Sequence, residues 1–189
     1  PRIVREYVRD VKINTPLDAI KAGMAYLPED RKAEGIIADL SVRENMILAL
    51  QAKRGMFKLM SRKEQEELTD KYIKMLQVKT ASRETPIKSL SGGNQQKVLL
   101  AKWMFADPDV LILDEPTRGI DVGAKYEIYE LIINMAKQGK TIIVVSSEMP
   151  EILGITNRIG VMSNGHLAGI VNTKETNQEE LLRLSAKYL

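Results

Sequence analysis

The sequence contains no cysteine, and only one histidine, one tryptophan and two phenylalanines occur among its 189 residues. Without cysteine there is no disulfide framework and no thiolate metal site. Every apolar run is far shorter than the roughly 20 residues that a membrane-spanning helix needs, and the first residues lack the apolar core of a signal peptide. The sequence therefore does not predict a disulfide scaffold or an integral membrane protein.

An excess of charge of one sign is also lacking, because 28 basic and 25 acidic residues leave a net charge of only +3. So small and scattered an excess gives no reason to expect a nucleic-acid partner. The composition is that of an ordinary globular protein, with 44% apolar and 28% charged residues in a chain long enough for one sizeable core. Composition therefore predicts a globular domain, and its chemistry has to come from local motifs.

The most informative stretch of the sequence runs from residue 90 to residue 122. Near its start, Ser91, Gly92 and Gly93 precede a segment with helical character. Glycines let a backbone approach a ligand closely, and a helix N-terminus offers free N–H groups at the positive end of its dipole. This combination favours an anion, most naturally a phosphate. The alternative is that the Gly-Gly pair is simply a loop.

The apolar run 110–113 is followed in the same stretch by Asp114 and Glu115. Four apolar residues in a row predict a strand buried on both faces of a parallel sheet, and α/β proteins bind ligands at the carboxyl ends of such strands. One carboxylate can hold Mg²⁺ there and the next can polarise a water molecule. The alternative is a solvated or helix-capping pair. Asp121, after a turn that begins at Pro116, is placed to cap the next helix.

Together, L-S-G-G-x-Q at 90–95, the apolar run ending in D-E-P-T and G-x-D at 119–121 resemble the ATP-binding cassette (ABC) ATPase family. By this resemblance they are the signature motif, the Walker B strand and the D-loop, and the ligands are ATP and Mg²⁺. The resemblance assigns cofactor binding to Ser91, Gly92, Gly93, Gln95, Glu29 and Asp121, metal binding to Asp114 and Glu29, and catalysis to Glu115 and Ser147.

Two positions depart from the family pattern. Glu29 stands where the family usually has the glutamine of the Q-loop, and an ionised carboxylate can ligate Mg²⁺ but cannot donate a hydrogen bond. Ser147 stands where the family usually has the switch histidine, and a hydroxyl can donate a hydrogen bond but cannot become cationic. Both departures predict a weakened ATP site on this side. The one histidine, His166, is predicted to lie in a surface hairpin turn.

Within the family, the residues at 29–32, 90–97, 116–125 and 146–151 resemble the second cassette of the tandem ATPases of bacterial monosaccharide importers. In those proteins each ATP lies between the P-loop of one cassette and the signature motif of the other. The implied partners are the first cassette of the same polypeptide, the sugar permease membrane subunits and, indirectly, a periplasmic sugar-binding protein. The implied location is the cytoplasmic face of the inner membrane, as a peripheral subunit.

The fold implied by the resemblance is α/β, a partial P-loop NTPase (RecA-like) core with a mostly parallel sheet and an inserted α-helical subdomain. Residues 1–40 would carry an edge strand and the Q-loop strand, residues 41–89 the helical subdomain, and residues 90–189 the remaining motifs with a C-terminal hairpin and helix. No segment has the P-loop pattern G-x-x-x-x-G-K-[ST]. We therefore expect the P-loop and most of the N-terminal β-subdomain to be absent, and the chain alone to neither bind ATP tightly nor hydrolyse it.

Local patterns predict the individual elements. Helix starts are expected at Thr15, Ser41, Ser61, Asp121 and Asn177, with capping boxes at both serines. Buried strands are expected at 24–27, 110–113 and 141–145, and a weak edge strand at 7–13.

Two other functions stay open. A DNA-repair or ribosome-associated ABC ATPase would bring long heptad arms or a strongly basic extension. A non-catalytic module would dock on the permease through residues 29–89 without any chemistry. The transporter interpretation requires that Gly92 is not buried inside the domain and that its helix begins at the same end of the sheet as Asp114.

Overall fold

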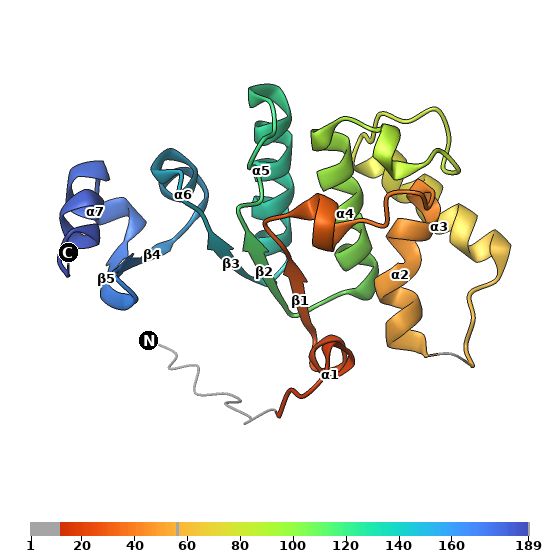
Figure 1. Cartoon of the computed structure of the whole chain (residues 1–189), viewed down its shortest axis with the longest axis horizontal. Coiled ribbons are helices and arrows are strands. Elements are labelled where there is room, and N and C mark those ends of the chain that lie inside the picture. Colours follow the sequence, from red (N-terminus) through yellow and green to blue (C-terminus); the bar gives the residue numbers. More distant parts are fainter. Residues whose placement is uncertain (1–11, 56, 189) are drawn as a thin grey trace.

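The centre of the fold is a parallel sheet of three short strands, in the order β1-β2-β3 (Figure 1). The computed structural model describes residues 12–55 and 57–188. The strands are β1 (Met24–Leu27), β2 (Val110–Asp114) and β3 (Thr141–Val145). All three were predicted from the sequence. Most of the predicted edge strand at 7–13 lies outside the described residues.

One face of the sheet is covered by two long helices, α4 (Gly92–Ala106) and α5 (Val122–Lys137). Leu27, Leu111 and Leu113 point to this face and are at most 1% exposed. They pack against apolar side chains of α4 and α5, which form the main core with them. Asp121 caps α5 as predicted, and Gly139, at φ +90°, follows the end of the helix.

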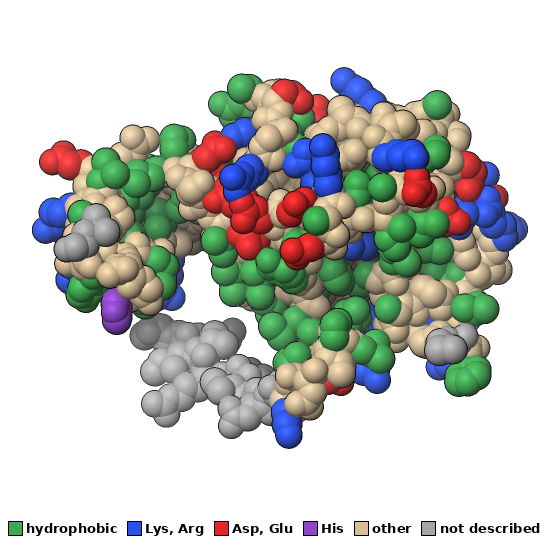
Figure 2. Space-filling view, viewed as in Figure 1, with side chains coloured by type: hydrophobic (Ala, Val, Ile, Leu, Met, Phe, Trp, Pro, Cys, Tyr) green, Lys and Arg blue, Asp and Glu red, His purple; other side chains and the backbone are tan. Residues whose placement is uncertain are grey.

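The other face of the sheet is open among the described residues, so the expectation of strands buried on both faces is wrong here. Tyr26 is 46% exposed, Ile143 is 48% exposed and Val145 is 51% exposed. The pairing of Tyr26 with Ile112, and of Ile112 with Ile143, places these residues in one row across the sheet. Figure 2 shows apolar side chains over this region, with acidic side chains along its upper edge. An apolar run reports hydrophobicity but not which faces a neighbour covers.

The helical part of the fold precedes α4. It consists of α1 (Pro16–Lys21) before β1, and of α2 (Val42–Arg54) and α3 (Arg62–Met75) between β1 and α4. Short turns lie at Arg31–Gly35 and Ile87–Ser89. None of the helices within residues 12–55 and 57–188 is long and apolar enough to cross a membrane.

The two predicted capping boxes differ. Ser41 and Glu44 form the complete reciprocal pair at the start of α2. Ser61 accepts a hydrogen bond from the Glu64 backbone, but the Glu64 side chain pairs instead with Arg54 at 2.5 Å. The second capping box is therefore only half formed, because a nearby cation competes for its carboxylate.

The C-terminal part contains α6 (Met149–Ile155), the hairpin of β4 (Arg158–Ser163) and β5 (His166–Asn172), a short turn at Thr173–Glu175, and α7 (Gln178–Ser185). Asn164 and Gly165 both have positive φ, as a two-residue hairpin turn requires. His166 is exposed beside this turn. Asn177 caps α7 as predicted.

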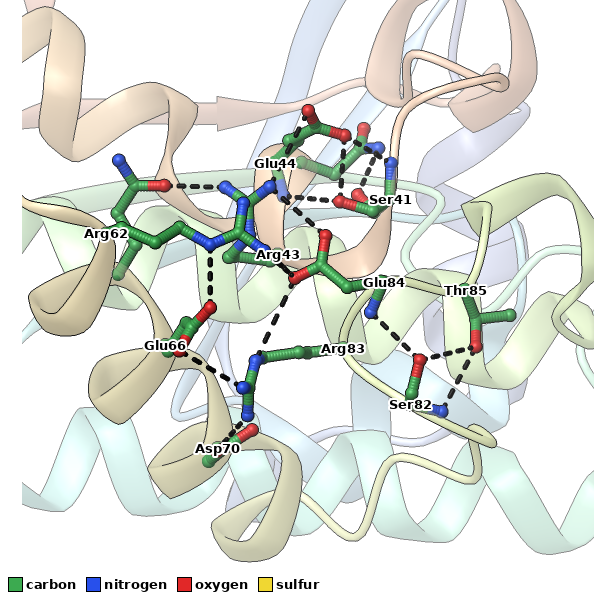
Figure 3. A network of polar contacts seen from close by, with 12 residues as sticks. Ser41, Arg43, Glu44, Arg62, Glu66, Asp70, Ser82, Arg83, Glu84 and Thr85 are labelled. Carbon is green, nitrogen blue, oxygen red and sulfur yellow. Dashed lines mark hydrogen bonds and ion pairs between the residues drawn. The ribbon is translucent and has the colours of Figure 1, made fainter.

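A network of ion pairs holds the connector between α3 and α4 against α2 and α3 (Figure 3). Arg43 of α2 is 5% exposed and donates to both carboxylate oxygens of Glu84, at 2.9 and 3.2 Å. Arg62 of α3 donates to the same carboxylate at 2.7 Å. Arg83 of the connector pairs with Asp70 of α3 at 2.6 Å. The connector that leads to Ser91 is thereby fixed by charges from two helices.

The network predicts a specific acid sensitivity. The hydrogen bond from Arg43, and the charges of Arg43 and Arg62, lower the pKa of Glu84 below its ordinary value of 4.5. A carboxyl with a depressed pKa in the folded state contributes stability above its unfolded pKa and loses it as the pH falls through the folded pKa. We expect Glu84→Gln to lower the free energy of unfolding by about 1 kcal/mol at pH 7, since the half-exposed carboxylate is screened by solvent.

That difference should begin to shrink below pH 4.5 and approach zero as the pH falls through the lowered pKa of folded Glu84. Urea denaturation of both proteins between pH 7 and pH 3 measures it. Equal differences at all pH values would contradict the pairing.

Candidate functional site

The carboxyl ends of the three parallel strands meet at one edge of the sheet, and four of the predicted site residues lie there. Glu29 follows β1, Asp114 ends β2, Glu115 follows it, and Ser147 follows β3. The parallel register brings these positions together, since Leu27 pairs with Leu113 and Asp114 with Val145. The edge therefore collects three carboxylates and a hydroxyl, as the strand pattern predicted.

Asp114 accepts a hydrogen bond from the hydroxyl of Tyr26 at 3.0 Å. This bond and the charge of Asp114 raise the pKa of Tyr26 above its ordinary value of 10.0. Tyr26 was not among the predicted site residues. Its position could have indicated it, because the partner of Tyr26 is Ile112, and Asp114 is the next residue of β2 on the same face.

Glu115 adopts a left-handed backbone, with φ +45°. For a residue other than glycine, this conformation costs of order 1 kcal/mol and is found mainly where surrounding contacts impose it. Two contacts do so here. The Glu115 N–H donates to the Val145 carbonyl at 2.8 Å, and its carboxylate accepts from the Ser147 N–H at 2.8 Å. The Glu115 carboxylate therefore contacts the backbone of Ser147, the residue at the switch position.

Glu29 forms an ion pair with Arg118 of the loop after β2. Arg118 was not a predicted site residue, and nothing in the local pattern around it signals a contact with residue 29. A metal ion would therefore have to displace a guanidinium from the Glu29 carboxylate.

The N-terminus of α4 lies at the same end of the sheet. Gly92 is half-buried, and a Cβ on it would lie 3.5 Å from Cδ1 of Ile120 in the loop after Asp114. The transporter interpretation required this placement. Ser91 is exposed and does not cap the helix backbone with its side chain; its hydroxyl accepts from the Asn94 amide at 2.8 Å.

Gly93 is buried where α4 approaches α5. A Cβ on Gly93 would lie 2.7 Å from the Cβ of Ala124, closer than real Cβ atoms come. Asp121 lies beside this approach and accepts the Ala124 N–H at 3.0 Å, so its side chain caps α5. Packing alone therefore requires glycine at position 93.

Gln95 does not reach the surface of the site. It is 5% exposed, and its amide donates to the carbonyls of Leu90 at 3.1 Å and Ile87 at 3.3 Å. The geometry does not support the predicted cofactor contact of Gln95. Instead the residue holds the segment that leads into α4, because its donor is satisfied there.

A buried pair connects the loop after β2 to α6. Thr117 and Glu151 are 1% and 3% exposed, and the Thr117 hydroxyl donates to the Glu151 carboxylate at 2.8 Å. Neither residue was a predicted site residue. Their contact ties the loop that carries Arg118 to the helix that follows Ser147.

Comparison with known proteins agrees with this geometry. The family model described as ABC transporter matches residues 5–118, more than half of the chain. The chain belongs to the ABC transporter family.

Three similar relatives of this ABC transporter chain are galactose/methyl galactoside import ATP-binding proteins. That of Treponema pallidum is 58% identical over 96% of the chain and that of Fusobacterium nucleatum is 54% identical over 96%. That of Pasteurella multocida is 49% identical over 99% of the chain. The chain spans 36% of the length of the first two relatives and 37% of the third.

Two dimeric structures of the ATP-binding cassette MJ0796, one in a post-hydrolysis state with ADP and Pi, share the fold. Each has a TM-score of 0.70 at 23% identity and covers 81% of this chain and 64% of the cassette. The predicted α/β class with a parallel sheet and the P-loop NTPase likeness are thereby confirmed.

The donor set at the sheet edge of this ABC cassette fits Mg²⁺ bound together with a nucleotide. Within residues 12–55 and 57–188, no group of three or more acidic, histidine or cysteine side chains could hold a metal by itself. Mg²⁺ is commonly bound through one or two carboxylates with phosphates and water supplying the other ligands. Asp114 has that chemistry, since Tyr26 engages only one of its oxygens.

The contact between Tyr26 and Asp114 can be tested by titration. Asp114→Asn removes the charged acceptor that favours the protonated hydroxyl, so the pKa of Tyr26 should fall towards 10.0. Carbon-13 NMR of labelled tyrosine follows this ionisation, and Tyr26→Phe assigns the signal. Asp39→Asn, which alters an exposed carboxylate paired with Lys88, serves as the control. An unchanged Tyr26 pKa in Asp114→Asn would mean that the hydrogen bond does not form in solution.

Proposed function

We propose that the protein containing this chain is the ATPase of a monosaccharide importer, acting on galactose-type sugars. The chain would supply its signature motif to a composite ATP site. The observation that carries this proposal is the position of the Ser91–Gly93 turn. It begins α4 at the same end of the sheet as the carboxylates that follow β2, so both could face bound nucleotide. The high identity to galactose/methyl galactoside import proteins supports the sugar class.

In this proposal each group has a separate task. Ser91, Gly92 and Gly93 contact the terminal phosphate of an ATP that is held by the P-loop of the first cassette. Asp114 holds Mg²⁺ at the site of this cassette, and Glu115 orients the attacking water. Mg²⁺ supplies charge neutralisation between the phosphates. Ser147 can donate a hydrogen bond to phosphate. Asp121 caps α5 and thereby fixes the start of that helix beside the signature turn.

The partners follow from this assignment. They are the first cassette of the same polypeptide, the permease membrane subunits and, indirectly, a periplasmic sugar-binding protein. The protein would then lie against the cytoplasmic face of the membrane. We further propose that residues 41–89 are the helical subdomain that receives the permease.

We infer that the two ATP sites are unequal. Glu29 replaces the usual glutamine and is held by Arg118, and Ser147 replaces the usual histidine and cannot become cationic. The signature side of this chain would therefore contribute more to turnover than its Walker B side.

The asymmetry predicts different effects of two substitutions in the intact ATPase reconstituted with its permease. Gly92→Asp places a carboxylate at a helix N-terminus that should face phosphate, and we expect a loss of ATPase activity of about 100-fold or more. Glu115→Gln should cost less than about tenfold. Steady-state ATPase and sugar-uptake measurements compare them, with wild type as reference. Equal losses in both variants would contradict the asymmetry.

A non-catalytic docking module is the second candidate, favoured by the lack of any G-x-x-x-x-G-K-[ST] segment in the chain. Without that loop there is no backbone cradle for the β-phosphate, so the chain alone should show no micromolar affinity for Mg·ATP by calorimetry. A measured micromolar affinity would contradict this expectation. Capture of the sugar permease by the chain alone, through residues 29–89, would support docking without chemistry.

A further inference from the structure

The turn that follows β1 is fixed on α4. It spans Arg31–Gly35, and the Asp30 carboxylate caps it by accepting the N–H groups of Lys32 and Ala33, both at 3.0 Å. At its end, the Lys102 ammonium of α4 donates to the Gly35 carbonyl at 2.9 Å. A Cβ on Gly35 would lie 2.9 Å from Cδ1 of Leu99, so the turn lies directly on the helix.

From this fixed turn, the Arg31 side chain reaches the two segments that form the proposed site. Its Nη1 donates to the carbonyl of Arg118, in the loop after β2, at 3.0 Å. Its Nη2 lies 2.7 Å from the position that a Cβ on Gly92 would occupy. The guanidinium therefore lies between the first residue of α4 and the loop after the carboxylates of β2. A side chain at position 92 would collide with it.

The same loop is joined to this segment a second time. The Arg118 side chain pairs with Glu29, while the Arg118 carbonyl accepts from Arg31. Two independent polar contacts thus link residues 29–31 to Arg118. The Arg31 Nε is buried and has no hydrogen-bond partner among the described residues. A buried N–H without a partner is costly, so an arginine held in this way calls for an explanation beyond stability.

We propose that Arg31 is a positioning residue for the signature turn. Its planar guanidinium sets the distance between Gly92 and the loop that follows Glu115. This inference rests on the proposed function, because it concerns turnover at the composite ATP site. Arg31 acts through Gly92 and Arg118 rather than on nucleotide, since Nη1 is engaged by a carbonyl. Lysine cannot replace it, because an ammonium is a point charge without a fork that spans two segments.

The test uses the intact ATPase with its permease and compares Arg31→Ala, Arg31→Lys and Lys32→Ala. Lys32 is the adjacent exposed cation, and we expect its variant to match wild type. Arg31→Ala should lower kcat by about tenfold to 100-fold, because a displaced turn no longer closes on the phosphate. The KM for Mg·ATP should change by less than about threefold, because ATP is held by the other cassette. Arg31→Lys should lie much nearer to Arg31→Ala than to wild type.

A double-mutant cycle with Gly92→Ala distinguishes positioning from a general loss of stability. In the wild-type background the new Cβ meets the guanidinium. In the Arg31→Ala background that collision is gone. The factor by which Gly92→Ala reduces kcat should therefore be at least about threefold smaller there than in the wild-type background. If Arg31→Ala does not fold, the Arg31→Lys variant carries the kinetic test.

The outcomes separate this inference from the proposed function. If the intact wild-type protein shows no permease-coupled ATPase activity, or Gly92→Asp is as active as wild type, the proposed function fails. If these two proteins behave as expected but Arg31→Ala and Arg31→Lys keep the wild-type kcat, the positioning role is overturned. Strictly multiplicative effects of Arg31→Ala and Gly92→Ala on kcat would overturn it as well.

Discussion

The parallel pairing of three short strands is the constraint on which the rest of the structure depends. The register β1-β2-β3 sends three chain segments out of the sheet at the same edge, although they are far apart in the sequence. Each segment leaves with a polar group: Glu29, the pair Asp114 and Glu115, and Ser147. Because parallel strands bury their central backbone groups in the ladder, polar chemistry collects only at their ends. The direction of the strands therefore brings these positions together, whichever side chains occupy them.

Close packing of α4 fixes the other half of the site. Helix α4 shares one apolar core with the sheet, to which its buried Leu99 and Leu100 belong, and it meets α5 at Gly93, where no Cβ fits. Its N-terminus therefore cannot move away from the loop after β2 without opening the core. The ion-pair network around Arg43 and Glu84 fixes the connector that enters α4. Core packing and surface charge thus specify the same position for the signature turn.

Local sequence patterns predicted the elements well, because their signals are local. Asp121 marked the start of α5, and the surface turn was predicted at His166, where β5 begins directly after Asn164 and Gly165, since caps and turns depend on residues within four positions. The three strands lie where the sequence predicted them. The predicted burial of β3 was wrong, because a run of apolar residues does not reveal whether one face of the strand is left uncovered.

Such local patterns did not predict the contacts between residues that are distant in the sequence. Tyr26 and Asp114 are 88 residues apart and Arg31 and Arg118 are 87 apart, and no spacing rule connects them. Gln95 is a related case. A motif shows which residue types occur together but not what each side chain contacts. In the structure, the Gln95 amide donates to the carbonyls of Ile87 and Leu90. The family pattern gave the candidate site residues, and the structure shows which of them are exposed and which are engaged inside the fold.

The internal partners of the candidate site residues support the proposal that the two sides of the cassette are unequal. The carboxylates at the sheet edge each have a partner within the chain: the Tyr26 hydroxyl for Asp114, the Ser147 N–H for Glu115, and the Arg118 guanidinium for Glu29. A ligand that approached them would have to share or displace these donors. At the start of α4, by contrast, the Ser91 hydroxyl is turned to Asn94 and leaves the helix backbone uncapped by its side chain. In the proposed function, an anion held by the first cassette would complete that helix end rather than compete for it, which is the physical basis for assigning the signature turn the larger share of turnover.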